Sequence, residues 1–168
     1  SERIWRKHGI AGQRIFHLGR KYNFWGPAGV SGPCGPDTEM FFITRDHCAL
    51  GRNDCSPACD CGRYVEIWND VFMEYEKLAD GSFRSLPQKN VDTGMGLLRV
   101  VSILTGKTSV YETDVYQEAM GFLRDRAASM DERRRRIVAD HLQTALFAIG
   151  DGANPANVGA GYVVRRIL

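Results

Sequence analysis

Residues 91–100 hold the densest group of side chains that can bind a charged ligand. They read Val-Asp-Thr-Gly-Met-Gly-Leu-Leu-Arg-Val, which indicates a glycine-punctuated strand end running into a basic amphipathic helix. Gly94 and Gly96 let a ligand approach the backbone closely. Asp92 can neutralise an amino group, and Arg99 can pair with phosphate through its planar guanidinium. The segment predicts a nucleotide site, and on local grounds a tight packing turn explains it equally well.

A second group of chemically active side chains is a cysteine cluster. Four of the five cysteines fall in one turn-rich loop that also holds His47, Asp54 and Asp60; they are Cys48, Cys55, Cys59 and Cys61. Four thiolates can hold Zn²⁺ and staple an insert that has no core of its own. The spacing is not a paired C-x-x-C, so structural zinc and free reduced thiols stand as equal interpretations. We expect Cys34, outside the loop, simply to be packed.

Composition sets outer limits on function. The 168 residues suffice for one core, and 22 basic against 20 acidic residues give a net charge of only +2. Nucleic-acid binding therefore depends on where the basic groups cluster, which is at 133–136 and at Arg165 and Arg166. Apolar runs such as 145–149 are too short to span a bilayer, and no signal peptide is apparent. We expect a cytoplasmic protein without a membrane partner.

The first half of the chain predicts mainly strands. Ser1 can cap a helix that ends at Gly9, and 14–18 and 39–44 are strand candidates on either side of a Gly/Pro-rich loop at 26–36. Residues 64–75 alternate, which places Asn69 and Val71 on one face and Glu66 on the other. A turn at residues 80–81 returns the chain through 83–86 to the strand that approaches Asp92.

The second half predicts helices. Helical spacing covers 96–105 and 113–127, and Ser129 with Glu132 forms a capping box that opens a longer helix to about residue 149. A basic amphipathic helix follows at 162–168. Strands first and helices afterwards predict an α+β fold with an antiparallel sheet.

Several separated motifs, taken in order, resemble alanyl-tRNA synthetases across essentially the whole chain. The upstream ones are Asn-Phe-Trp at 23–25, Ser-Gly-Pro-Cys-Gly-Pro at 31–36, Glu-Ile-Trp-Asn-Asp-Val-Phe-Met at 66–73 and Val-Asp-Thr-Gly-Met-Gly-Leu at 91–97. The downstream ones are Ile-Val-Ala-Asp-His-Leu at 137–142, Asp-Gly at 151–152, Pro155, Asn157 and Gly-Tyr-Val-Val-Arg-Arg at 161–166.

The resemblance implies a fold and an activity. Residues 1–127 would form part of a class II aminoacylation core, with a cysteine-rich insert at 45–62, and 128–168 would begin the helical tRNA-recognition region. The activity would be ATP-dependent activation of alanine, with Mg²⁺, and transfer of the alanyl group to tRNA(Ala). The first two class II motifs would lie upstream and an editing domain downstream, so we expect residues 1–168 alone to form little alanyl-adenylate. The oligomeric state stays open.

The resemblance also implies roles for single residues. Asp92 would bind the α-amino group of alanine, Asn69 would orient the amino acid, Trp25 and Val71 would wall the pocket, and Gly94 would leave room beside the methyl group. Gly96 and Arg99, in the third class II motif, would bind ATP, and Asn157, Arg165 and Arg166 would contact tRNA. On local grounds alone, core packing is favoured for Trp25 and Val71, a cap is as good an interpretation of Asp92, and a solvated face is favoured for 133–136.

Three positions depart from the family pattern. Leu98 replaces the glutamate that precedes the motif's arginine, and Gln143 and Ala160 stand where arginine is usual. We expect the change at Leu98 to impair nucleotide handling, because it removes a carboxylate beside Arg99. Two other functions compete with the ligase. Leu98 favours a paralogue that binds alanine or adenylate without charging tRNA, and the cysteine loop with the arginine runs would suffice for a zinc-knuckle RNA-binding module.

Overall fold

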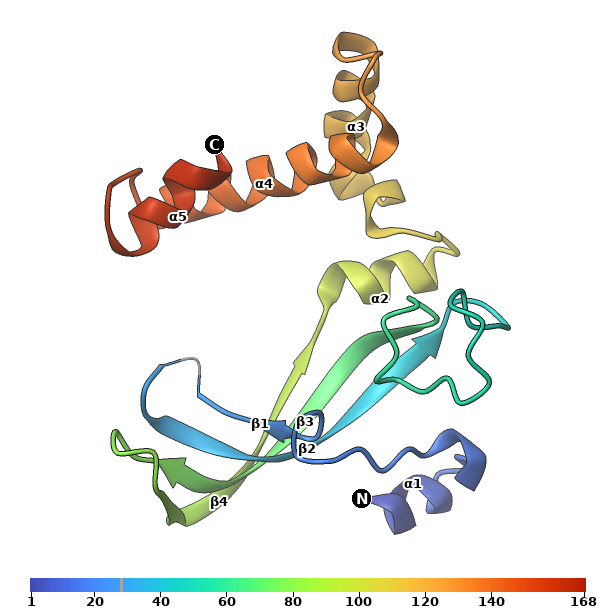
Figure 1. The fold of residues 1–168 in the computed structure, drawn as a ribbon, viewed down its shortest axis with the longest axis vertical. Helices are drawn as coiled ribbons and strands as arrows, with labels where there is room; N and C mark the ends of the chain where they lie inside the picture. The colour runs from blue at the N-terminus through green and yellow to red at the C-terminus, as the bar shows by residue number, and fades with distance from the viewer. Residues whose placement is uncertain (28) are drawn as a thin grey trace. The chain divides into compact units, whose positions relative to one another are not determined.

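The computed structural model describes residues 1–27 and 29–168. The chain forms two compact units, Ser1–Val100 and Val101–Leu168. The described strands all lie in the first unit, and the second is helical (Figure 1). Helix α2 (Leu97–Leu104) runs across the boundary between them. Among the described residues, no helix is long and apolar enough to cross a membrane.

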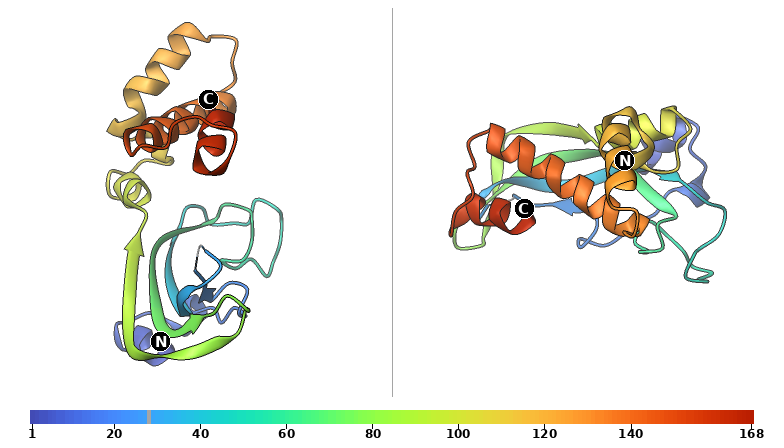
Figure 2. Two further views of the ribbon diagram at one scale, coloured as in Figure 1. Left: turned by 90° about the vertical axis from the view of Figure 1, so that its left-hand side faces the viewer. Right: turned by 90° about the horizontal axis from the view of Figure 1, so that it is seen from above.

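The first unit is built on an antiparallel sheet with the strand order β1-β2-β3-β4. Figure 2 shows the long strands curving side by side, with the cysteine-bearing loop connecting the ends of two of them. This confirms the predicted α+β class. The strands are β1 (Phe24–Trp25), β2 (Gly32–Ile43), β3 (Tyr64–Lys77) and β4 (Phe83–Met95).

The turn between β3 and β4 lies where the sequence predicts it. Gly81 has a φ of +85°, which favours glycine, and its N–H donates to Leu78 O at 2.9 Å. The Asp80 carboxylate accepts from both the N–H and the hydroxyl of Ser82. The two strand segments predicted on the return path are one continuous strand.

Two predictions in the N-terminal part are wrong. Residues 14–18 form no strand: a 3₁₀ turn, η1 (Gly12–Arg14), is followed by irregular chain. The Gly/Pro-rich loop is shorter than expected, because β2 already begins at Gly32. Gly35 lets β2 lie close against β3, since a Cβ at position 35 would lie 1.8 Å from the main-chain oxygen of Phe72. Helix α1 (Glu2–Lys7) forms where predicted, with Ser1 at the N-cap position, but the Ser1 side chain makes no capping hydrogen bond and the helix ends at Lys7, before Gly9.

A register shift between β2 and β3 alters which side chains share a face. Met40 pairs with Trp68 and Phe41 pairs with Glu66, so Ile67 is an extra residue in β3. A bulge of this kind breaks the strict alternation of a strand. Glu66 consequently lines the same cavity as Asn69, and the prediction that placed them on opposite faces is wrong.

The second unit packs its helices in sequence, α3 against α4 and α4 against α5. The elements are η2 (Val110–Glu112), α3 (Asp114–Arg126), α4 (Glu132–Gly150) and α5 (Gly159–Ile167). Its buried centre contains Tyr116, Met120, Ala139, Ala145 and Val164.

The start of α4 differs from the predicted capping box. The N-cap is Asp131, whose carboxylate accepts from the Arg134 N–H at 2.8 Å, and not Ser129. Glu132 instead receives a hydrogen bond from Arg124 at 2.9 Å. A carboxylate at the N-cap also interacts favourably with the positive end of the helix dipole.

Candidate active site and metal centre

A cavity of about 320 Å³ collects six of the residues that the sequence assigns to small-molecule binding. They come from β1, β3, β4 and the residue after β4: Trp25, Asn69, Val71, Asp92, Gly94 and Gly96. Glu66, Thr93 and Met95 complete the lining. The sequence alone does not show that these residues meet in one cavity, because Trp25 and Asp92 lie far apart along the chain.

Strand register accounts for this convergence. Val71 pairs with Asp92, and Asn69 pairs with Gly94. Alternate residues of paired strands share a face, so these four groups lie together. Asp92 lies inside β4 and therefore caps no helix. No side chain or backbone atom lies within 4 Å of where a Cβ of Gly94 would be, which leaves space for a ligand group.

The two predicted wall residues differ in exposure. Val71 is 6% exposed and Trp25 is 40% exposed. Val71 thus combines core packing with a position in the cavity wall. Trp25 keeps too much surface for a core residue, and its indole is available at the rim.

Asn69 is held by the carboxylate of Glu39, which the sequence did not predict as a site residue. Its Nδ2 donates to Glu39 Oε1 at 3.1 Å across the β2–β3 pair. Burial, together with the charges of Glu66 and Asp37, raises the pKa of Glu39 to about 7. The sequence contains no signal for this contact, because it depends on the register between two strands some thirty residues apart.

Arg99 is in the first turn of α2, beside the end of β4. Its Nη1 donates to the main-chain oxygen of Glu66 at 2.9 Å and lies 3.4 Å from Glu66 Oε2. Gly96 lets the arginine fold back, since a Cβ at 96 would lie 3.0 Å from Arg99 Cδ. The structure therefore brings a second unpredicted carboxylate, Glu66, to the predicted phosphate-binding residue.

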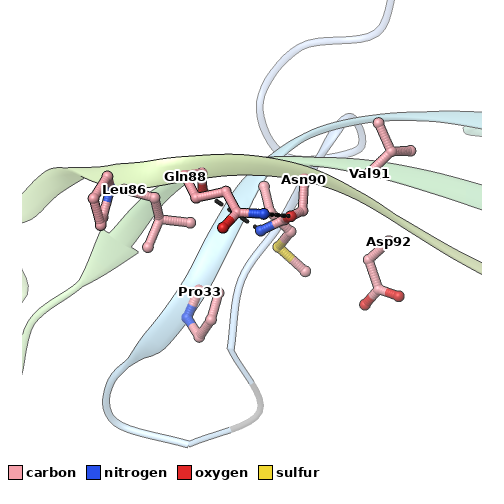
Figure 3. A pocket seen from close by; sticks show the side chains of 8 residues that line it. Pro33, Leu86, Gln88, Asn90, Val91 and Asp92 are labelled. Carbon is pink, nitrogen blue, oxygen red and sulfur yellow. Dashed lines mark hydrogen bonds between the residues drawn. The ribbon is translucent and has the colours of Figure 1, made fainter.

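A larger hollow of about 510 Å³ adjoins the first and shares Asp92 with it. Figure 3 shows its side chains, with Val91 and Asp92 pointing to opposite sides of β4. Gln88 Nε2 donates to Asn90 Oδ1 at 3.2 Å, and the other walls are mainly apolar, including Pro33, Met73, Leu86 and Pro87. Apart from Asp92, no predicted site residue lies here.

The four cysteines of the insert converge. Their sulfur atoms all lie within 4.8 Å of one another, with Cys48 and Cys59 at 3.8 Å and Cys55 and Cys61 at 3.5 Å. Four sulfurs bound to one zinc at about 2.3 Å would be about 3.8 Å apart, so the set fits a tetrahedral metal. All four are thiols, and the Arg63 N–H, donating to Cys61 Sγ, lowers the pKa of that thiol to about 6.

Cys34 behaves as the sequence predicts. It is fully buried in β2 and lies outside the cysteine cluster.

The predicted tRNA-contacting residues lie at the C-terminal end of the second unit. Arg165 Nη1 donates to Asn157 Oδ1 at 2.5 Å, and the Arg166 guanidinium lies over the Tyr162 ring. Both arginines are exposed. In contrast, three arginines of the 133–136 run pair with acidic neighbours at the start of α4.

Comparison with known proteins identifies the family of the chain. The family described as tRNA synthetases class II (A) matches residues 1–168, and the chain belongs to that family. Similar proteins carry the name alanine--tRNA ligase. They include those of Treponema denticola (47% identical) and Treponema pallidum (49% identical), each matched over 100% of this chain. The protein of Borrelia hermsii is 42% identical over 98% of this chain. In each case the chain spans 29% of the relative's length.

Proposed function

We propose that this chain is the part of an alanine-tRNA ligase that binds alanine and ATP and begins the tRNA-binding region. The observation that carries the proposal is the single cavity that gathers Trp25, Asn69, Val71, Asp92 and Gly94. An alanine site needs a carboxylate for the ammonium group and a shallow apolar wall for one methyl group. Asp92 supplies the first, and Val71 with Trp25 supplies the second.

The proposed reaction has two steps. A carboxylate oxygen of alanine attacks the α-phosphorus of ATP, the bond from that phosphorus to the bridging oxygen breaks, and pyrophosphate leaves. A ribose hydroxyl of tRNA(Ala) then attacks the alanyl carbonyl, and AMP leaves. Arg99 would bind the phosphates of ATP, which arrives with Mg²⁺ as the charge-neutralising ion, and Gly96 would give the nucleotide access to the backbone.

The remaining sites complete the proposal. Asn157, Arg165 and Arg166 would contact tRNA, and we keep the functional boundary at 127/128, with residues 1–127 for activation and 128–168 for recognition. Arg165 supports this assignment, because Asn157 already fixes its guanidinium in an exposed position.

A structural Zn²⁺ would be held by Cys48, Cys55, Cys59 and Cys61, whose spacing matches a tetrahedral thiolate site. The metal would tie together the polar insert between β2 and β3. Close cysteines that form no disulfide are typical of a reducing compartment, which supports a cytoplasmic location.

The test is alanine-dependent exchange of pyrophosphate into ATP, measured with a full-length enzyme that carries this segment. Exchange with alanine followed by charging of tRNA(Ala) supports the ligase. Exchange without charging would favour the alanine-binding paralogue, and RNA binding without exchange would favour the zinc-knuckle module. Residues 1–168 alone are expected to show little exchange.

A further inference from the structure

The Asn69 side chain has one satisfied end and one unsatisfied end. Its Nδ2 donates to Glu39 Oε1 at 3.1 Å. Its Oδ1 is buried and has no hydrogen-bond partner among the described residues. Buried acceptors without a partner are uncommon and cost free energy, so this oxygen indicates a donor that comes from outside the described chain.

The Glu39 carboxylate accepts from the Asn69 amide, and the Asp37 carboxylate interacts with the same side chain, so the two acidic groups select which end of the amide is left over. An ionised carboxylate only accepts hydrogen bonds, so it selects the NH₂ end of Asn69 and disfavours the flipped amide, which would bring two acceptors together. The atom that remains for a ligand is therefore an acceptor. Asp92, in the wall of the same cavity, is also an acceptor when ionised.

We propose that Glu39 is a positioning residue for amino-acid binding: it orients the Asn69 amide so that Oδ1 and the Asp92 carboxylate together receive the ammonium group of the ligand. An ammonium group has three N–H donors and no acceptor, so two converging acceptors suit it. The inference rests on the proposed function and adds to it the residue that determines the polarity of the amino-acid subsite.

The charge of Glu39 is then coupled to binding. Glu66 on β3 and Asp37 on β2 are the charged groups that act on Glu39, and both favour its neutral form; Arg99 pairs with Glu66, and Asp92 faces the same cavity from β4. A neutral Glu39 can donate to Asn69 Oδ1 as well as accept from Nδ2, so it no longer favours one orientation of the amide. With a pKa of about 7, ionisation of Glu39 makes the KM for alanine fall as pH rises through neutrality.

The experiment measures kcat and KM for alanine in pyrophosphate exchange between about pH 6 and about pH 9, with a full-length enzyme carrying this segment. Glu39→Gln should raise the KM about tenfold and flatten its pH dependence, because glutamine can accept or donate and has no charge to lose. Glu74→Gln is the matched control: that carboxylate lies on β3, 3.6 Å from Lys89 Nζ, and its loss should leave the alanine KM unchanged.

A double-mutant cycle with Asn69→Ala separates a positioning role of Glu39 from a general loss of structure. If Glu39 acts through Asn69, then Glu39→Gln should add almost nothing to the KM of an Asn69→Ala variant. An unchanged KM and pH profile for Glu39→Gln, or an equal additional loss in the Asn69→Ala background, overturns the inference. Should circular dichroism show Glu39→Gln to be unfolded, Glu39→Asp replaces it and is expected to raise the KM while retaining the pH step; a normal KM for it overturns the inference.

The proposed function and the positioning role of Glu39 can be overturned separately. Wild-type enzyme that shows no alanine-dependent exchange overturns the proposed function and the inference with it. Wild-type enzyme that is active, with Glu39 variants that bind alanine normally, overturns the positioning role and leaves the proposed function intact.

Discussion

Arg99 is anchored by Glu66: its Nη1 donates to the Glu66 main-chain oxygen at 2.9 Å and lies 3.4 Å from the Glu66 carboxylate. The family pattern places a glutamate directly before this arginine, where this chain has Leu98. Because of the bulge at Ile67, a carboxylate from β3 reaches the guanidinium instead. Arg99 therefore has an acidic partner despite the change at Leu98.

This arrangement predicts a small effect at residue 98. The side chains of Arg99 and Glu66 are 50% and 37% exposed, and pairs of this kind contribute about 0.2–1 kcal/mol. Since Arg99 is also held by a main-chain oxygen, we expect Leu98→Glu to change the ATP KM of the full-length enzyme less than about threefold, and Glu66→Gln to raise it less than about fivefold. Arg99→Ala should be far worse, at about tenfold or more, because charge-assisted bonds to phosphate are lost.

Steady-state exchange at varied ATP concentrations measures all three variants. A large fall in ATP KM for Leu98→Glu would show instead that the missing glutamate does impair nucleotide handling, as the sequence pattern alone suggests.

Asp92 offers a sharper test of the alanine site. Asp92→Asn removes the counter-charge of the ammonium group, and a hydrogen bond to a charged group contributes about 1.5–3 kcal/mol, so activation should fall by about tenfold to a hundredfold. The fold should persist, because Asp92 is exposed in β4. Pyrophosphate exchange and a thermal melt measure the two effects.

Glu76→Gln is the control for Asp92. Glu76 lies on β3, where its carboxylate pairs with Arg84 at 2.7 Å, and it lines neither of the two cavities. Its loss should leave exchange nearly normal. Near-normal kinetics for Asp92→Asn would remove that residue from the site.

The contrast between predicted and missed site residues has a physical cause. The resemblance of the ordered motifs to a known family implies the roles of Asn69, Val71, Asp92 and Gly94, and strand alternation adds only that Asn69 and Val71 share a face. The position of Glu66 depends on one extra residue in β3, and the bulge that this residue forms has no compositional signature.

Contacts between elements could not be predicted from the sequence either. The Glu39–Asn69 bond depends on the register between β2 and β3. At the start of α4, both Ser129 and Asp131 are good caps by type, and the choice of Asp131 is accompanied by the pairing of Glu132 with Arg124 from α3. Local propensity cannot rank two caps when a tertiary contact contributes to the choice.

The proposed zinc site predicts a stoichiometry. Protein purified in reducing buffer without chelator should carry one Zn²⁺ per chain by elemental analysis. Cys59→Ser should abolish the metal and, because the insert loses its staple, lower the melting temperature. Cys34→Ala is the matched control, since that buried thiol lies outside the cluster and its loss should leave the zinc content unchanged. Absence of zinc in the unmodified protein would favour free thiols.

The basic end of α5 provides a test of tRNA binding. Arg165→Ala and Arg166→Ala should each weaken tRNA(Ala) binding and reduce the salt dependence of binding by about one unit of log K per log salt, if each arginine neutralises one phosphate. Asn157→Ala should have a smaller effect in the same direction, because it frees the Arg165 guanidinium from its hydrogen bond without removing the charge. Arg134→Ala is the control: Arg134 is exposed on α4 and pairs with Asp131, so its loss should leave both affinity and salt slope unchanged. Filter binding at several salt concentrations measures these quantities, and equal losses for Arg134 and Arg165 would mean that the positive charge acts diffusely and that α5 carries no specific contact.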